Sequence, residues 1–391
     1  MKYYSNVFLV SLVLLFLSCS KGSSKLIVTV KNTLSIDRQF ETVELSKEQL
    51  NVKDLSLYAI KDIDAGEFVV SQTVDLDGDG IMDQLLFQPK INVNSEKKFE
   101  VVVLPKDNKP KANVYCYSRF VPERTDDYAW ENDRVAFRTY GPTAQKMVEE
   151  NIKGGTLSSG IDAWLKRVDY PIINNWYKKE TETEGTYHED TGEGLDNFHV
   201  GISRGVGGIA VKEDSVFHYS KNFIKWRTIT SGPLRTSFYL EYANWKVGSK
   251  EINESKIISL DYGSNLSKFE TTISGTETIS AGLTLHENDG EVTANNQLGF
   301  ISYWQPHTDS ELGTAIVTKN NYFAGQETYE TTAKDESNAY LHLHVIDNKT
   351  IYYAGFTWKK SNQFKDKLAW GNYLNEFSTK INNPLLIEIK K

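Results

Sequence analysis

Short runs of alternating apolar and polar residues fill the first part of the chain after its N-terminal segment. KLIVTVKN alternates, and LSLYAI, EFVVSQTV, QLLF and KKFEVVVL are short runs rich in β-formers. Turn residues separate these runs at the spacing expected of a β-sandwich. We therefore expect a small β domain over residues 26–110, ended by the linker KDNKPKA at residues 106–112.

Longer strands are predicted between residues 226 and 325. RTSFYLEYANW and KIISLDYGSNLSKFETTIS are too long and too rich in aromatic and β-branched residues for short-loop structure. In the first of them, Phe238, Leu240 and Tyr242 share one face, and the residues between them point the opposite way. Such strands predict a large curved antiparallel β-sandwich over residues 111–391. They resemble the sandwiches of aldose mutarotases and several polysaccharide lyases.

A few short helices interrupt this mainly β pattern. Pro142 opens a helical stretch that Gly154 and Gly155 close. Near the C-terminus, NQFKDKLAWGNYLNEFSTKI has apolar residues at helical spacing, Pro384 follows it, and LLIEI is a last strand. The predicted apolar stripe of this helix consists of Phe364, Leu368, Leu374, Phe377 and Ile381.

The N-terminal residues predict export and lipidation. MKYYSNVFLVSLVLLFLSC has a lysine at position 2, an apolar run too short for a comfortable membrane span, and a cysteine after Ser18. We expect a signal peptide at residues 1–18, lipidation of Cys19 and a polar tether at residues 19–25. The tether lacks an acidic export run, so we expect a lipid anchor on the periplasmic side of the outer membrane. The alternative is an ordinary secreted protein cut near Ser23.

Composition narrows the function classes. The net charge is −8 and no basic stripe is present, so nucleic-acid binding is not expected. An acidic protein with an acidic substrate needs a local group of Arg or Lys. Aromatic residues make up 12% of the chain, which suits either sugar-binding surfaces or an all-β core. Only Cys116 remains after lipidation, so no internal disulfide is expected.

The segment DLDGDGIMD has the spacing of a calcium loop. Asp75, Asp77, Asp79 and Asp83 occupy loop positions 1, 3, 5 and 9, and Gly80 supplies the sharp turn. Position 12 lacks the glutamate of an EF-hand, so the loop is more like calcium loops between strands of extracellular β proteins. Four close carboxylates would repel one another without a cation. We expect a structural calcium ion here, and the alternative is an Asp-Gly hairpin turn.

The densest group of titratable residues lies in GTYHEDTGEGLDNFHVGISRGVGG, residues 185–208. Glycine disfavours helix and strand interiors, and it lets a backbone come close to a ligand. Histidine titrates near neutrality and suits acid–base catalysis, while arginine offers a fork for a carboxylate. The alternatives are a hydrogen-bonded loop that clamps two sheets, or a metal site that includes His188. The candidate residues are Tyr187, His188, Asp190, Glu193, Asp196, His199 and Arg204.

Further candidates are scattered over three stretches, ENDRVAFRTYGP, SGIDAWLK and SYWQPH. Each Trp or Tyr among them is either a stacking platform for a sugar ring or a core residue, and core is the more common outcome for a single Trp. The remaining lone histidines of the C-terminal half alternate with apolar or small residues and are interpreted as structural. The candidates are Asp133, Arg134, Arg138, Tyr140, Asp162, Trp164, Lys166, Trp304, Gln305 and His307.

The combination of AFRTYGP, SGIDAWLK, YHEDTGEGLD, VGISRGVGG and SGPLR resembles the signature of a family of Bacteroidetes lipoproteins long described as a domain of unknown function. The resemblance runs over most of the chain after the signal peptide and includes DGDGIMD. Members of this family sit in polysaccharide-utilisation systems. At least one, from the system that degrades the sulfated polysaccharide ulvan, is an oligosaccharide dehydratase. The resemblance implies removal of water from a non-reducing-end uronic acid, which leaves a 4,5-unsaturated residue.

Such a reaction needs one arginine for the uronate carboxylate, one base for the C5 proton and one acid for the leaving hydroxyl. We expect Arg204 or Arg138 on the carboxylate, His188 as the base, and Tyr187 or Tyr140 as the acid. Adjacent residues of a strand face opposite ways, which favours Tyr140 as the partner of His188. No redox cofactor is required.

Other readings of the same residues stay open. A polysaccharide lyase uses the same groups with a sugar oxygen as the leaving group. A mutarotase-like enzyme would use a histidine with a carboxylate such as Glu193, and a non-catalytic sugar-binding lipoprotein would need only aromatic contacts. For the anionic oligosaccharide, the expected binding residues are Asp162, Trp164, Lys166, Glu193, Asp196, Trp304 and His307.

Overall fold

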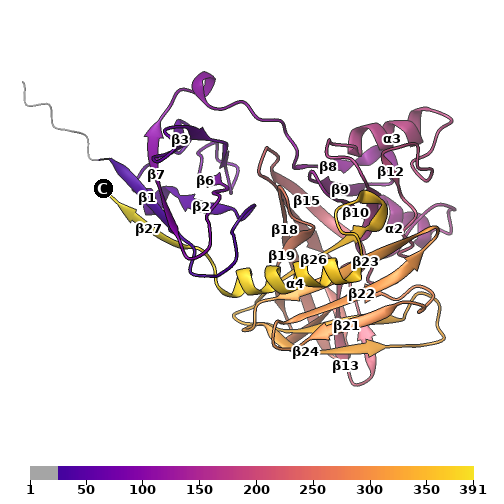
Figure 1. Cartoon of the computed structure of the whole chain (residues 1–391). Helices are drawn as coiled ribbons and strands as arrows, with labels where there is room; N and C mark the ends of the chain where they lie inside the picture. The colour runs from indigo at the N-terminus through magenta and orange to yellow at the C-terminus, as the bar shows by residue number, and fades with distance from the viewer. Residues whose placement is uncertain (1–24) are drawn as a thin grey trace, which may run out of the picture.

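The computed structural model describes residues 25–391 (Figure 1). The predicted signal peptide, Cys19 and all of the tether except Lys25 lie outside the described residues. Within them, the chain forms several antiparallel sheets and few helices, so the predicted mainly β fold class is confirmed. Among residues 25–391, none of the helices combines the length and apolar character that a membrane crossing requires.

The N-terminal domain packs two small sheets around a core of its own. The sheets have the strand orders β27-β1-β7-β3-β4 and β2-β6-β5. Alternating residues such as Val28, Val30 and Phe99 fill the space between them. The strands predicted from KLIVTVKN to KKFEVVVL are therefore confirmed. They are β1 (Leu26–Lys31), β2 (Val43–Ser46), β3 (Tyr58–Asp62), β4 (Phe68–Val69), β5 (Ser71–Val74), β6 (Gln84–Phe87) and β7 (Glu96–Val103), with β27 (Leu386–Lys390) from the C-terminus.

The last strand of the chain joins the first one. β27 pairs antiparallel with β1, from Ile27 opposite Lys390 to Lys31 opposite Leu386. The sequence analysis assigned residues 111–391 to the large unit, whereas this pairing adds β27 to the small domain. The pairing joins the two ends of the described chain, so a local pattern does not predict it. β27 covers an edge of β1 that would otherwise expose its backbone hydrogen-bonding groups.

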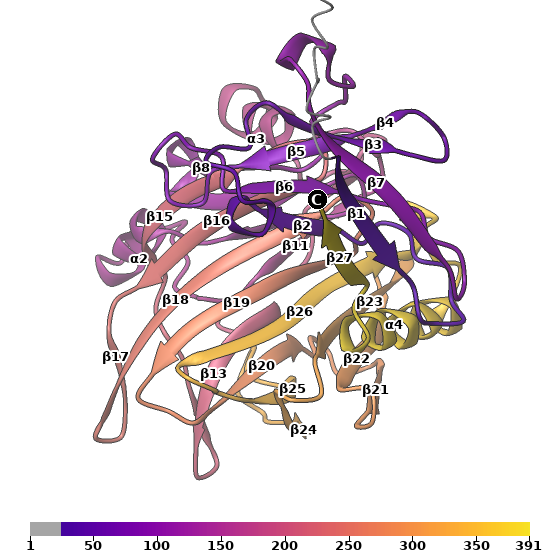
Figure 2. The same cartoon turned by 90° about the vertical axis from the view of Figure 1, so that its left-hand side faces the viewer.

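Two further antiparallel sheets form the large sandwich. The larger, twisted sheet crosses the front of Figure 2 and has the order β15-β16-β18-β19-β26-β23-β22-β21, with β17 paired to β18. The opposing sheet is β14-β13-β20-β25-β24. Phe238, Leu240 and Tyr242 are buried in the core between the sheets, as predicted. The strands are β13 (Val206–Glu213), β14 (Val216–His218), β15 (Phe223–Thr230), β16 (Arg235–Tyr242), β17 (Trp245–Val247), β18 (Lys250–Asp261), β19 (Leu266–Ser274), β20 (Thr278–Thr284), β21 (Glu291–Asn295), β22 (Phe300–His307), β23 (Ser310–Thr318), β24 (Phe323–Tyr329), β25 (Asn338–His344) and β26 (Lys349–Trp358).

A fifth sheet, β12-β11-β10-β9-β8, connects this sandwich to a helix. One of its faces adds Trp130 and Phe137 to the sandwich core, and the other face packs against α3 through Trp164. This sheet carries the candidate residues Arg138, Asp162, Trp164 and Lys166. Its strands are β8 (Tyr117–Val121), β9 (Asp127–Glu131), β10 (Ala136–Thr139), β11 (Asp162–Lys166) and β12 (Gly194–Leu195).

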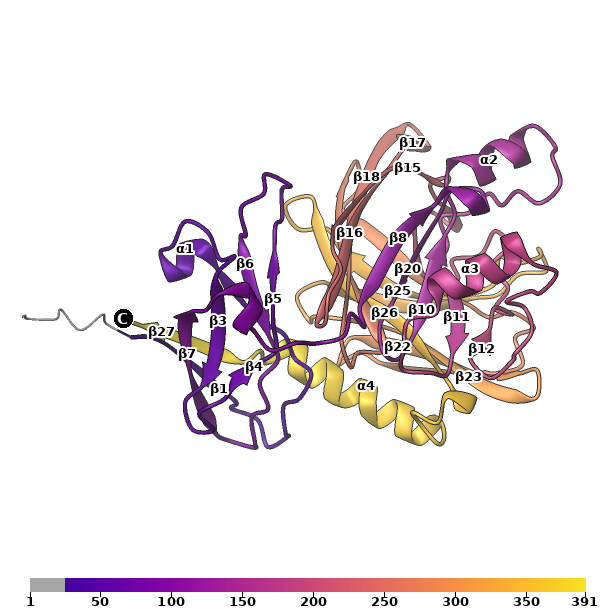
Figure 3. The same ribbon diagram turned by 90° about the horizontal axis from the view of Figure 1, so that it is seen from above.

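The helices of the described residues are α1 (Lys47–Leu50), α2 (Pro142–Glu149), α3 (Ile173–Glu182) and α4 (Lys367–Asn382), with 3₁₀ turns at Lys106–Asn108, Pro122–Arg124 and Lys359–Ser361. The predicted helices at Pro142 and near the C-terminus are confirmed. Leu368 is 70% exposed, so its place in the apolar stripe was wrong, and Trp370 is buried instead. Figure 3 shows the small domain and α3 at opposite ends of the molecule.

Candidate functional site

The candidate site lies on the face of the sheet β12-β11-β10-β9-β8 that α3 covers. Successive residues of a strand point to opposite faces. Phe137 and Ala163 therefore point into the sandwich core. Arg138 and Asp162, which lie opposite each other on β10 and β11, point the other way and form an ion pair. The period of the strands thus places a charged pair beneath α3.

Arg138 is the centre of a buried network. Its Nε donates to Asp162 Oδ2 at 2.8 Å, its Nη2 donates to Asp196 Oδ2 at 2.8 Å, and its Nη1 donates to the Tyr187 hydroxyl at 2.9 Å. Asp127 Oδ2 lies 3.5 Å from Nη1. Every nitrogen of this guanidinium is therefore engaged by the protein. This arrangement argues against the predicted contact between Arg138 and a substrate carboxylate.

Three carboxyl groups around one guanidinium give the network an excess of acid. Burial, followed by repulsion from Asp196, raises the pKa of Asp162 well above its ordinary value. Burial also raises the pKa of Asp196, and it raises the pKa of Asp127 to about 6. Oδ1 of Asp162 has no hydrogen-bond partner among the described residues. The network therefore favours keeping a proton near neutral pH, and it can supply one.

His188 lies at the surface above this network. Its Nδ1 is 2.6 Å from the carbonyl oxygen of Asp196, and half of its side chain is exposed. A carbonyl oxygen only accepts, so Nδ1 carries the hydrogen and Nε2 keeps a lone pair when the ring is neutral. Nε2 of His188 makes no hydrogen bond to the residues that the structure describes. His188 therefore has the tautomer and the exposure of a general base.

Two tyrosines contact the network from the interior. Tyr140 donates to Asp162 Oδ2 at 3.3 Å, and Tyr187 accepts from Arg138. Tyr140 is 7% exposed and Tyr187 is 1% exposed, and burial raises the pKa of both hydroxyls. Residues 187–188 form a turn and not a strand, so the ring centroids of Tyr187 and His188 lie 4.7 Å apart. The strand-based argument for Tyr140 over Tyr187 therefore does not apply.

Arg124 is a neighbour of this group that the sequence analysis missed. It ends the 3₁₀ turn Pro122–Arg124 and is half-buried, and its Nη1 donates to Thr125 Oγ1 at 3.3 Å. Burial opposes its charge, but Tyr187 and Asp127 favour it, and the net effect is a raised pKa. No carboxylate among the described residues forms an ion pair with it. The signal in the sequence was an arginine followed closely by Asp126 and Asp127.

Arg204 lies in the interior and away from any open surface. It is 1% exposed, and Tyr219 stacks on its guanidinium with 3.8 Å between the ring centroid and Cζ. Its Nη1 donates to Ser159 Oγ at 3.0 Å, and its Nη2 donates to the carbonyl oxygen of Ile202 at 2.8 Å. This burial argues against the predicted role of Arg204 in binding a substrate carboxylate.

The glycines of residues 185–208 let this segment lie against β11. A Cβ on Gly194 would lie 2.0 Å from the carbonyl oxygen of Leu165, and one on Gly205 would lie 1.9 Å from that of Ile161. Both glycines also have positive φ, +112° and +58°. These contacts fit the alternative of a loop that clamps neighbouring strands. They do not fit the expectation that these two glycines approach a ligand.

Three predicted substrate-binding residues are buried. Trp164 is fully buried among the aromatic rings of α3 and Tyr187. Lys166 donates to Glu131 Oε2 at 2.7 Å, and both side chains are buried. Trp304 is 8% exposed and packs in the cluster beneath α4. Sugar contacts by these three residues are therefore not supported by the arrangement.

Glu193 and His307 have separate hydrogen-bond partners outside the Arg138 network. Glu193 accepts from the Tyr170 hydroxyl at 2.8 Å and from Trp176 Nε1 at 3.1 Å. His307 Nε2 is 2.9 Å from Asn197 Oδ1, and burial lowers the pKa of His307 to about 4. His307 therefore contacts the segment at Asn197, the residue after Asp196 of the network.

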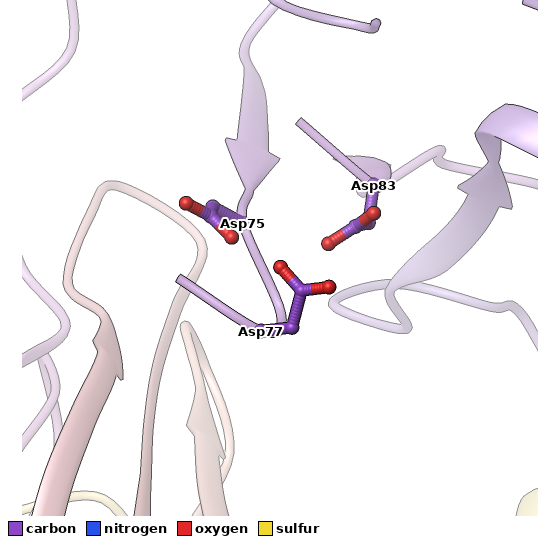
Figure 4. Close-up of side chains that lie close together, drawn as sticks. All are labelled: Asp75, Asp77 and Asp83. Atoms are coloured by element: carbon purple, nitrogen blue, oxygen red, sulfur yellow. The ribbon is translucent and has the colours of Figure 1, made fainter. Parts of the chain in front are cut away.

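The acidic loop lies between β5 and β6 of the small domain (Figure 4). Carboxylate oxygens of Asp75, Asp77 and Asp83 lie within 4.8 Å of one another, which fits three ligands of one cation. Asp79 is outside this group, and its Oδ1 accepts from the Ile81 N–H at 2.7 Å. Lys47 Nζ is 2.5 Å from Asp83 Oδ1 and supplies part of the positive charge that the loop needs.

Comparisons with known proteins place the chain in a family. It is 53% identical over 395 residues, the full length of both chains, to "Uncharacterized protein P7" of Formosa agariphila. Its fold matches a protein in the glycosyl hydrolase family 38 from Enterococcus faecalis, with a TM-score of 0.50, 11% identity and 94% of this chain covered. An alpha-mannosidase from Enterococcus faecalis V583 matches with a TM-score of 0.46 and 10% identity. The chain spans about half the length of these two solved structures. The model of the family described as "Domain of unknown function (DUF4861)" matches residues 30–387, and the chain therefore belongs to that family.

Proposed function

We propose that this protein is an oligosaccharide dehydratase that removes water from a non-reducing-end uronic acid, as in oligosaccharides of the ulvan type. The observation that carries the proposal is the position of His188. Its Nδ1–H is fixed by the Asp196 carbonyl, its side chain is half exposed, and its ring lies beside Tyr187 of the Arg138 network. A base and a proton source in contact are the groups that an elimination requires.

A carbohydrate substrate is supported by two independent likenesses. The motifs of the sequence resemble lipoproteins of polysaccharide-utilisation systems. The second is the fold neighbour, which is named as a protein in the glycosyl hydrolase family 38. We further propose a lipid anchor at Cys19 on the periplasmic side of the outer membrane, which suits an enzyme that receives oligosaccharides rather than whole polysaccharide.

In the proposed mechanism, Arg124 replaces Arg204 as the ligand of the substrate carboxylate. Arg124 is half-buried, close to Tyr187 and free of a carboxylate partner among the described residues. Its charge would stabilise the enediolate that develops when His188 Nε2 removes the C5 proton. The electron pair of the C5–H bond forms the C4–C5 double bond, and the C4–O bond breaks.

The leaving hydroxide needs a proton, and Tyr187 is the proposed donor. Its hydroxyl accepts from Arg138, which leaves its own proton available. The carboxyl groups of Asp162 and Asp196 hold protons because of burial, and they can replace the one that Tyr187 loses. The product is water and a 4,5-unsaturated uronate, and no oxidant or reductant is consumed.

The test is turnover of saturated acidic oligosaccharides prepared from ulvan. Ultraviolet absorbance of the unsaturated uronate and mass spectrometry are measured on the same sample. We expect increasing absorbance with the loss of one water and no shorter chains. Shorter products would instead indicate a lyase, and ligand binding without any absorbance change would contradict elimination.

His188→Gln sharpens this test. The variant should lose about 10²–10⁴-fold in kcat, the usual contribution of a general base. His344→Gln is the matched control, because His344 is an exposed histidine at the end of β25. Equal activity of His188→Gln and the wild type would remove His188 from the mechanism.

A further inference from the structure

A cleft of about 700 Å³ separates the small domain from the large sandwich. The segment of residues 36–44 forms one wall, the outer face of β18, β19 and β26 forms a second, and α4 forms a third. We call this space the interdomain cleft. Its volume is typical of small-ligand sites, which often lie between domains. Figure 3 shows α3, which covers the candidate site, on the side of the large sandwich away from the small domain.

The walls of the interdomain cleft are held in place by contacts between the domains. Arg235 Nη1 donates to Glu44 Oε1 at 2.6 Å, and its Nε donates to Asp261 Oδ1 at 2.5 Å. Thr42 Oγ1 also donates to Asp261, at 2.7 Å. These contacts tie residues 42–44 of the small domain to β16 and β18. Because the walls are already fixed, little free energy is needed to reorganise them when a ligand binds.

Aromatic rings line two sides of the cleft. Phe364, just before α4, contacts Tyr373 on the helix with a centroid distance of 5.1 Å, and Tyr373 contacts Phe377 at 5.9 Å. Across from them, Phe40 is 42% exposed and has φ +59°. A bulky residue in this conformation is strained, and a Cβ on Gly263 would lie only 2.5 Å from its ring. The fold thus keeps the exposed ring of Phe40 at the cleft, although its positive φ is unfavourable for a bulky residue.

Acids and cations are equal in number along the cleft, but two of the cations form no ion pair with the described residues. Arg235 and Lys380 have acidic partners within the cleft. Lys319 has no ion-pair or hydrogen-bond partner for its Nζ among the described residues, although it lines the cleft. Arg134 donates from Nε to Asn265 Oδ1 at 2.6 Å, stacks over Phe364, and forms no ion pair with the described carboxylates. Two cations are therefore available to an acidic ligand.

We propose that the interdomain cleft is a second, non-catalytic binding site for an acidic oligosaccharide. Aromatic rings of Phe40, Tyr373 and Phe377 would pack on the apolar faces of sugar rings. Lys319 and Arg134 would bind a carboxylate or sulfate of the same chain. The ligand class rests on the proposed function, but the site is separate from His188, so each can fail alone.

The test is calorimetric binding of tetragalacturonate to the protein, with its carboxyl-reduced form as the neutral counterpart. We expect tetragalacturonate to bind more tightly than the neutral form. Lys319→Ala should weaken binding about tenfold, the loss expected for one charge-assisted contact, and should reduce the preference for the acid. Phe40→Ala should weaken both ligands, and thermal melting checks that this variant folds.

Two matched variants make the result decisive. Lys250→Ala changes an exposed lysine outside the cleft and should bind like the wild type. Arg124→Ala should lose turnover and keep tetragalacturonate binding, which separates this proposal from the dehydratase. Wild-type binding by both Lys319→Ala and Phe40→Ala, absence of tetragalacturonate binding, or loss of binding in Arg124→Ala would overturn the second site.

Discussion

The Arg138 network and the interdomain cleft use cations in opposite ways. Arg138 is 7% exposed and has three carboxylates and a tyrosine around it. Lys319 has no partner of this kind among the described residues, and it lines an open cleft. A buried charge is tolerated only when it is paired, whereas an exposed charge keeps its hydration and can exchange it for a ligand. Arg138 therefore holds the site together, and Lys319 is available for binding.

The largest expected effect comes from removing Arg138. Arg138→Met leaves Asp162 and Asp196 buried without their cation, which should cost about 3–5 kcal/mol in the free energy of unfolding. The loss should be smaller at low pH, because protonated carboxyls do not need the guanidinium. Urea denaturation at neutral pH and at low pH measures the loss in the free energy of unfolding and its dependence on pH.

The control for this comparison is Lys319→Met. It removes a cation that has no ion pair among the described residues, so the free energy of unfolding should change by no more than about 0.5 kcal/mol. If Arg138→Met were as stable as Lys319→Met, the contrast between the two regions would not hold.

A smaller effect is expected from Asp127 and depends on pH. Burial raises its pKa from 3.8 to about 6, so the folded state retains a proton that the unfolded state releases first. The folded state then binds more protons between these values, and stability falls as the pH rises through this range. This difference in pKa between the folded and unfolded states corresponds to a loss of about 3 kcal/mol in the free energy of unfolding by neutral pH. Asp127→Asn should remove this dependence.

The measurement is the difference in unfolding free energy between wild type and Asp127→Asn from pH 4 to pH 7. Tyr177→Phe provides a second reading, because the Tyr177 hydroxyl donates to Asp127 at 3.1 Å and favours its charged form. Removing that hydroxyl should move the loss of stability to higher pH. A difference that stays constant over this range would mean that Asp127 titrates normally.

Local patterns predicted the strands and helices well, but they did not predict which charges are buried. Phe238 and Leu240 follow directly from the period of a strand, and the helix after Pro142 follows from its end signals. The burial of Arg204 and Trp164 depends on Tyr219 and on α3, which are brought near by the fold. A residue type suited to catalysis is equally suited to a buried network, so sequence alone could not separate the two.

Long-range contacts explain the remaining differences. The pairing of β27 with β1 and the position of Arg124 beside Tyr187 each join parts of the chain that are far apart in sequence. The interdomain cleft likewise combines residues 36–44 with α4. The surroundings of His188 are more local, because its hydrogen bond to Asp196 lies within one segment.

The acidic loop of the small domain extends the comparison to a region with too little positive charge. Asp75, Asp77 and Asp83 converge, and Lys47 is their close cation among the described residues. We expect millimolar calcium to raise the free energy of unfolding by about 2 kcal/mol. This is the size expected when the calcium concentration is well above the Kd of a site with the affinity of extracellular calcium modules.

Thermal melting with calcium, and with magnesium at equal ionic strength, measures this effect. Asp77→Asn should abolish the response to calcium. Asp79→Asn should preserve most of it, because the Asp79 carboxylate lies outside the converging group and accepts from the Ile81 N–H. Equal loss in both variants would favour the full sequence spacing over the geometry of three ligands. An unchanged melting temperature with calcium would mean that Lys47 alone balances the loop, whereas three carboxyl groups surround Arg138.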